Sequence, residues 1–153
     1  MGDKHIFCAG IDNSIKAIDL TTNKLDFTLE GHSDTPTCLS LSHCGSFLLS
    51  NSLDNTLRSW DIRPFAPSNR VVGTFLGHQH SNLEKNLLGC AWSQDDKMVA
   101  AGSADRLTWV WNALTAEVEH TLGGHKAQVN DVKMVGERIV SASSDKTIIV
   151  GNI

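Results

Sequence analysis

The chain has 153 residues, with 13 Lys and Arg against 17 Asp and Glu, so its formal net charge is −4. A chain of this length can bury one core as a single domain, and its 41% of hydrophobic residues excludes disorder as the main state. No apolar run approaches the length of about 20 residues that a membrane-spanning helix needs. The net negative charge also argues against broad, sequence-independent binding to nucleic acid, because such binding needs clustered Lys and Arg.

The cysteines are few and unevenly spaced. They are Cys8, Cys38, Cys44 and Cys90. This spacing fits neither a Cys-x-x-Cys zinc or redox pair nor a dense disulfide framework. We therefore expect the four thiols to be reduced and buried, in a nuclear or cytosolic compartment. No cofactor is expected, since the glycines follow no nucleotide-binding order.

The chain repeats itself. Similar segments surround four aspartates that lie roughly 40 to 50 residues apart, and a Gly-His pair precedes three of them. The aspartates are Asp12, Asp54, Asp105 and Asp145, and the pairs are Gly31-His32, Gly77-His78 and Gly124-His125. A period of about 40 to 45 residues is typical of a β-propeller blade.

Between these landmarks the apolar residues alternate or run in short β-branched bursts, and no stretch keeps a helical apolar face. The sequence therefore predicts an all-β chain of short antiparallel strands.

Gly-His, a Ser-x-x-x-Asp turn and Trp-Asp at fixed offsets resemble the WD40-repeat family over nearly the whole chain. The resemblance implies a β-propeller whose blades have four strands, a to d from the inside outward. In chain order the fourteen strands that it implies cover 6–10, 14–19, 25–29, 37–42, 46–52, 56–62, 71–75, 87–93, 98–103, 107–113, 117–122, 129–135, 138–143 and 147–153. Residues 1–153 then form one propeller fragment: a partial blade at 5–30, full blades at 31–76 and 77–123, and a partial blade at 124–153. About three and a half blades do not close a ring. We expect part of a seven-bladed ring, with open blade edges through which the fragment could self-associate.

The family uses the repeated His, Ser, Asp and Trp as a buried structural tetrad. By resemblance the tetrad is complete in the second blade, as His32, Ser50, Asp54 and Trp60. The third blade has His78, Asp105 and Trp111 but Ala101 at the Ser position, and the fourth has His125, Ser141 and Asp145 but Gly151 at the Trp position. The same residue types could build a hydrolase triad. A catalytic set should occur once, whereas this one recurs, so we expect no enzyme.

Two other clusters have a functional and a structural interpretation. His78-Gln79-His80 could bind a metal, but two histidines fall short of a four-ligand site, so no metal is predicted. Which of the two is the structural histidine stays open. Trp92, Trp109 and Trp111 could stack single-stranded RNA. Packing between blades is the favoured interpretation of these tryptophans, so RNA contact is expected to be indirect at most.

More specific strings are Arg63-Pro-Phe-Ala-Pro67 and Glu84-Lys-Asn-Leu-Leu88. They resemble the WD-repeat subunits of the spliceosomal U5 small nuclear ribonucleoprotein. This resemblance implies a nuclear, non-catalytic scaffold in pre-mRNA splicing, whose partners are the large central protein of that particle and other spliceosomal subunits, with no membrane contact.

Function on a rigid scaffold is expected in its loops. The protein-binding candidates are Arg63, Phe65, Lys85, Arg106 and Lys146. Phe65 could instead tuck under its own blade. Trp60-Asp61-Ile62-Arg63 also has the W-D-x-R form of WD-repeat substrate receptors of cullin–RING ubiquitin ligases. That role, or another generic WD40 scaffold, is the alternative function.

Overall fold

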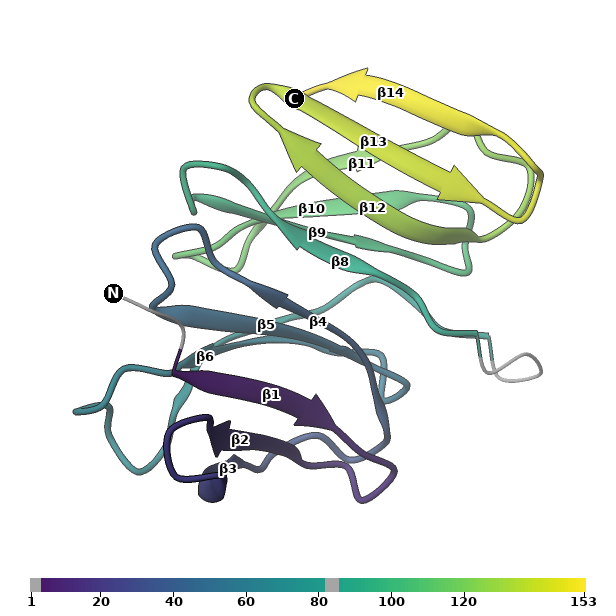
Figure 1. Cartoon of the computed structure of the whole chain (residues 1–153). Coiled ribbons are helices and arrows are strands. Elements are labelled where there is room, and N and C mark those ends of the chain that lie inside the picture. The colour runs from purple at the N-terminus through teal and green to yellow at the C-terminus, as the bar shows by residue number, and fades with distance from the viewer. Residues whose placement is uncertain (1–3, 82–85) are drawn as a thin grey trace.

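A computed structural model describes residues 4–81 and 86–153 as four antiparallel sheets that follow one another in chain order (Figure 1). We call them blade 1 to blade 4. Blade 1 contains β1 (His5–Ala9), β2 (Ile15–Asp19) and β3 (Lys24–Leu29). Blade 2 contains β4 (Pro36–Leu41), β5 (Phe47–Ser52), β6 (Leu57–Asp61) and β7 (Val71–Phe75).

The second half of the chain repeats the pattern. Blade 3 contains β8 (Cys90–Trp92), β9 (Met98–Gly102), β10 (Thr108–Asn112) and β11 (Val118–Leu122). Blade 4 contains β12 (Val129–Val135), β13 (Arg138–Ser143) and β14 (Ile148–Asn152). Within each blade the strands pair in sequence order, as simple meanders. The described residues contain no helix, and so none that could cross a membrane.

The predicted fold class and strand order are confirmed, with one notable difference in length. The strand expected over 87–93 is only Cys90–Trp92. Just before the strand, Gly89 keeps only one bond to β9: its carbonyl accepts from Gly102 N at 3.1 Å, whereas its N–H donates to the carbonyl of Asn130 in blade 4 at 2.7 Å. A backbone amide has one hydrogen to donate, so a contact between blades here replaces a contact within one.

Three apolar layers hold adjacent blades together. Between blades 1 and 2 the layer centres on Ile15, Leu29, Leu48 and Trp60. Between blades 2 and 3 it includes Leu49, Leu57, Phe75, Cys90, Trp92, Val99, Ala101 and Trp111. Between blades 3 and 4 it includes Ala91, Ala100, Val110, Val132, Met134 and Ile139. Blades 2 and 3 bury both faces against their neighbours, as expected of a propeller, whereas blades 1 and 4 each share one such layer.

The end of the row lacks such cover. Strand β14 forms one edge of blade 4, and its Ile148 and Val150 side chains are 69% and 59% exposed. Unpaired backbone groups at a strand edge and apolar side chains on an open face can both engage further β-structure. Self-association through this edge stays a prediction.

Blades 3 and 4 approach so closely at their inner ends that a side chain would not fit. A Cβ built on Gly102 would lie 2.3 Å from the carbonyl oxygen of Val129. The same contact region holds the Val129 N to Ser103 O hydrogen bond of 3.0 Å. Glycine is therefore required at position 102 by backbone approach, which fixes the spacing between the two blades.

The variant Gly102→Ala tests this spacing. The added methyl group must push Val129 away, so we expect the free energy of unfolding to fall by about 1–3 kcal/mol. Gly123→Ala is the matched control, because its Cβ would meet only the Leu107 Cδ2 atom at 3.4 Å. Urea unfolding of both variants measures the difference, and equal losses would contradict the close approach.

Candidate functional site

Blade 2 contains a chain of hydrogen bonds that runs from its third strand to its outer loop. Trp60 Nε1 on β6 donates to Ser50 Oγ on β5 at 2.8 Å. Ser50 Oγ lies 2.7 Å from His32 Nε2. His32 Nδ1, from the loop before β4, lies 2.9 Å from Asp54 Oδ2 in the β5–β6 turn. The structure thus brings together all four residues of the expected tetrad.

The proton positions follow from what each group can do. A carboxylate only accepts, so Asp54 requires a hydrogen on His32 Nδ1, and Nε2 is then an acceptor for the Ser50 hydroxyl. This is the polarity of a Ser-His-Asp triad. Ser50 is fully buried, however, and its oxygen already accepts from Trp60. The hydroxyl is thus out of contact with solvent, and the network joins the loop before β4, the β5–β6 turn and the two central strands of blade 2.

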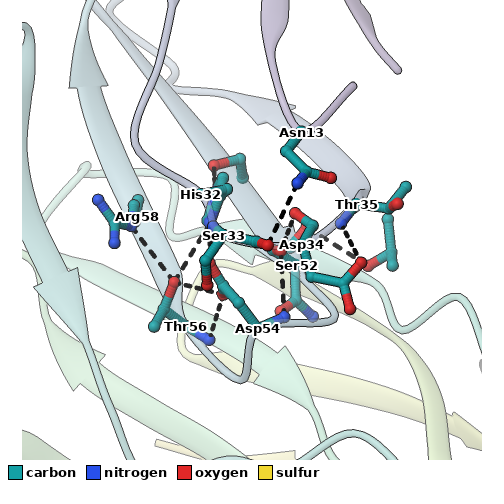
Figure 2. Close-up of polar contacts among 12 residues, drawn as sticks. Asn13, His32, Ser33, Asp34, Thr35, Ser52, Asp54, Thr56 and Arg58 are labelled. Carbon is teal, nitrogen blue, oxygen red and sulfur yellow. Dashed lines mark hydrogen bonds and ion pairs between the residues drawn. The ribbon is translucent and has the colours of Figure 1, made fainter. Parts of the chain in front are cut away.

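Asp54 anchors the network by accepting four hydrogen bonds (Figure 2). Its Oδ2 accepts from the His32 ring and from Ser33 N, and its Oδ1 accepts from Thr56 N and Thr56 Oγ1 at 2.9 and 2.6 Å. Burial by itself would raise the pKa of this carboxyl. The hydrogen bonds from His32, Thr56 and Ser33 outweigh burial and hold the pKa well below its usual range.

Blade 4 repeats the arrangement without a tryptophan. His125 Nε2 lies 2.9 Å from Ser141 Oγ, and His125 Nδ1 lies 3.1 Å from Asp145 Oδ2. Hydrogen bonds from the Thr147 hydroxyl and from Lys126 N lower the pKa of Asp145. Gly151 stands where blade 2 has Trp60, so blade 4 has no indole N–H to donate to the Ser141 hydroxyl, which pairs with His125.

Blade 3 differs from the expected tetrad. His78 does not bond to Asp105: its Nε2 lies 2.8 Å from Asn51 Oδ1 in blade 2. Asp105 Oδ2 instead accepts from Trp109 Nε1 at 2.9 Å, and Trp111 Nε1 donates to the Leu76 carbonyl at 3.0 Å. The physical reason is at position 101, where Ala has no hydroxyl to join the histidine to the indole.

The structure answers which histidine takes the family position. His78 stands edge-on to Trp111, with ring centroids 5.5 Å apart, much as His32 stands to Trp60 at 5.8 Å. His80 reaches the same Asn51 oxygen at 3.2 Å. Both histidines are therefore used, but only His78 packs on the indole.

The two rings share one acceptor, which fixes their protonation. Asn51 Nδ2 donates to the Leu88 carbonyl at 3.1 Å, so Oδ1 is the atom that faces the rings. An amide oxygen only accepts, and both Nε2 atoms must therefore carry hydrogen. Both Nδ1 atoms are buried and meet no hydrogen-bond partner in the described part of the chain. Burial, and then the nearby His80, lower the pKa of His78 to about 4.

Sequence reasoning missed Asn51. The signal available was a polar amide inside a strand, where asparagine is disfavoured, next to the tetrad serine. A buried amide in such a place needs a partner. Here its partners come from the neighbouring blade, so Asn51 links blade 2 to blade 3.

The loop after β6 presents Phe65 to solvent with 99% of the residue exposed, so it does not tuck under its blade. The base of the loop is fixed. Arg63 Nη2 donates to Asp61 Oδ2 at 2.6 Å, and its Nε also contacts that carboxylate. Arg70 Nη1 donates to the carbonyls of Asp61 and Arg63 at 3.0 and 2.9 Å. A stiff loop thus carries an uncovered aromatic ring.

Arg106 and Lys146 lie on the opposite rim, each directly after the aspartate of its turn. Both have a positive φ, of 72° and 69°. Between blades 3 and 4 this rim has a groove of about 670 Å³. The lining includes Gln79, His80, Arg106, Gln128 and Ser144. Lys85, the remaining candidate, lies outside the described residues.

Two other expectations concern metals and cysteines. Among residues 4–81 and 86–153 no three His, Cys, Asp or Glu side chains are grouped so that they could hold a metal ion. The expected burial of the cysteines is wrong in part. Cys90 is buried and Cys38 is half-buried, but Cys8 and Cys44 are exposed. These two lie where their strand or turn faces solvent.

Comparison with known proteins defines the class. The WD40 family model, described as "WD domain, G-beta repeat", matches residues 23–61, 69–112 and 116–150. The chain belongs to the WD40-repeat family. Its fold also matches the crystal structure of the computationally designed Ika4 protein, with a TM-score of 0.82 and 23% identity over 100% of this chain and 88% of that chain.

Curated relatives are more specific. The chain is 51% identical over 150 residues to the human U5 small nuclear ribonucleoprotein 40 kDa protein, covering 97% of this chain and 42% of that protein. It is 44% identical over 150 residues to the pre-mRNA-splicing factor cwf17 of Schizosaccharomyces pombe, covering 97% and 44%. The chain therefore spans less than half the length of these two relatives.

The paired histidines predict a specific pH dependence. Because the pKa of His78 falls from 6.5 to about 4 on folding, the unfolded chain binds the extra proton between these values. The contribution of His78 to the free energy of unfolding is fully present above pH 6.5. Between pH 6.5 and about 4 it declines as the pH falls, by about 1.4 kcal/mol per pH unit. In His78→Gln, which keeps an amide donor for Asn51, the decline should be shallower in chemical unfolding. An unchanged slope would contradict the buried neutral histidine.

Proposed function

We propose that the chain acts as a non-catalytic protein-binding scaffold of a U5 small nuclear ribonucleoprotein in pre-mRNA splicing, in the nucleus. The observation that carries the proposal is the 51% identity to the human U5 40 kDa protein, which extends over 97% of this chain. The similarity to a splicing factor of a distant yeast supports the same process. We further propose that the four blades are part of a seven-bladed ring.

The absence of a catalytic role is supported by where the polar groups point. The recurring His and Ser side chains are directed into the blades, and the serines are buried. A nucleophile needs access to substrate. The loops, in contrast, are open to solvent. The loop after β6 carries Phe65, the most exposed large hydrophobic residue in the described part of the chain.

Phe65 has the properties of a protein-contact anchor. It is aromatic, uncovered, and held on a loop whose base is fixed by Arg63 and Arg70. A loop whose base is already fixed loses less conformational entropy on binding, so burial of the ring in a partner's pocket contributes more to affinity. We propose this loop as the main contact with a large protein of the particle.

Direct RNA binding is not part of the proposal. Stacking of bases needs exposed aromatic rings within a basic surface. Trp60 and Trp111 are buried, Trp92 is 9% exposed, and Trp109 stacks on Trp111 with centroids 6.0 Å apart. The net charge of −4 also opposes a sequence-independent contact with phosphates. RNA contact would then be made by other subunits.

The ligase alternative depends on Arg63. Its guanidinium is bound to Asp61 through two of its nitrogens, within its own loop. This pairing uses the arginine to fix the base of the Phe65 loop. The names of the relatives also favour splicing over ubiquitin transfer.

Capture from nuclear extract tests the function. The tagged chain should retain U5 proteins and U5 RNA, and Phe65→Ser should weaken this retention by about tenfold or more, since it removes an interface anchor. Leu114→Ser is the matched control, because Leu114 is also an apolar loop residue, 92% exposed, on the equivalent loop of blade 3. Both variants should melt like the parent.

Retention of ligase subunits instead of U5 components would overturn the splicing proposal in favour of the alternative. Equal retention by the parent and Phe65→Ser, with the U5 components present, would leave the particle correct and the anchor wrong.

A further inference from the structure

Two cysteines from different blades meet at the inner side of the fold. Cys38 lies on β4 and Cys90 on β8, the innermost strands of blades 2 and 3. Cys90 Sγ donates to the Cys38 carbonyl oxygen at 3.9 Å, and Cys38 Sγ donates to the Leu39 carbonyl oxygen at 3.8 Å. The strands belong to separate sheets, so this contact is made by side chains rather than by a backbone ladder.

The two thiols differ in their surroundings. Cys90 is completely buried, whereas Cys38 is half-buried and so can meet a small reagent. Both pack in the apolar layer between blades 2 and 3, beside Trp92. From blade 4, the charges of Lys133 and Asp131 act on Cys38. The Cys38 thiol is therefore the more accessible of the two, and the Cys90 thiol is shielded from solvent.

The electrostatics give the two thiols different forms. The neighbouring Cys90 lowers the pKa of Cys38 to about 6, against the effect of burial; Lys133 assists and Asp131 opposes. The neighbouring Cys38, and then burial, raise the pKa of Cys90. A lowered pKa favours the thiolate, so Cys38 is the nucleophile of the pair.

We propose that Cys38 and Cys90 are a redox modification site, at which a peroxide oxidises the pair to a disulfide that joins the inner strands of blades 2 and 3. An accessible thiolate next to a second, resolving cysteine is the arrangement that favours this reaction over further oxidation. The proposal does not depend on the splicing function.

The reaction balances in two steps. The Cys38 thiolate attacks one oxygen of hydrogen peroxide, the O–O bond breaks, and hydroxide leaves; Cys38 is then a sulfenic acid. Cys90 sulfur attacks the Cys38 sulfur, the S–O bond breaks, and the hydroxyl group leaves with the Cys90 proton as water. The two thiols lose two electrons in total, and the peroxide gains them.

The bond would change the mechanics of the fold. It closes a loop of roughly 50 residues, which restricts the unfolded chain and raises the melting temperature of the oxidised protein. It also fixes blade 2 to blade 3 at their inner ends, close to the Asn51 link between the same blades.

The test uses the full chain with Cys8→Ser and Cys44→Ser, which removes the two exposed thiols. After treatment with hydrogen peroxide, the intact mass should fall by two hydrogens, and peptide mapping without reductant should show residues 38 and 90 in one linked species. The oxidised chain should melt at a higher temperature, and reductant should reverse both changes.

A trapping experiment identifies the order of the steps. With Cys90→Ala in the same background, Cys38 cannot be resolved, so its sulfenic acid should accumulate and react with dimedone; with Cys90 present, labelling should be at least several-fold lower. Cys38→Ser should label nowhere. The mass measurement on the chain that retains both thiols does not depend on how well these variants fold.

Two results would overturn the proposal. One is oxidation of Cys38 to sulfinic acid with Cys90 still a free thiol, because the pair would then fail to resolve. The other is disulfide formation only between separate chains.

Discussion

Blade 2 depends on burying polar side chains in a complete hydrogen-bonded relay. In blade 2 the relay runs from the Trp60 indole through Ser50 and His32 to Asp54, and each group both satisfies and orients the next. An unpaired polar group in this position would cost about 1–3 kcal/mol, so the relay holds its four members in one geometry. It ties the loop that carries His32 to the two central strands of the blade. The rims on which function would lie are fixed from beneath by this connection.

Much of this could be predicted because the pattern is local and repeated. Alternating apolar residues between Gly-His and Asp turns predict the strands, and the resemblance of blade 2 to the WD40 repeat implies its relay. Blade 3 could not be predicted in the same way. Once Ala101 removed the hydroxyl, the partner of His78 came from Asn51, which is far away in sequence and lies in another blade. The start of β8 was also beyond a local pattern, since Gly89 N, just before the strand, donates to the carbonyl of Asn130 in blade 4.

Contacts between blades and contacts within the loops have different effects: the first stabilise the fold, and the second hold exposed side chains in place. Contacts between blades are apolar layers with a few polar links, among them the shared amide of Asn51 and the thiols of Cys38 and Cys90. Exposure of residues on the loops is independent of these layers. Phe65 can be open to solvent because Arg63 and Arg70, rather than the core, hold its loop in place.

The most direct test of the relay is a double-mutant cycle on Ser50 and Trp60. Ser50→Ala removes the acceptor of the indole N–H, and Trp60→Phe removes the donor while keeping an aromatic ring. If the bond of 2.8 Å joins them into one unit, each change costs less in the presence of the other. Urea unfolding should then show a coupling energy of about 1 kcal/mol or more. Losses that add to within about 0.3–0.5 kcal/mol would contradict the account.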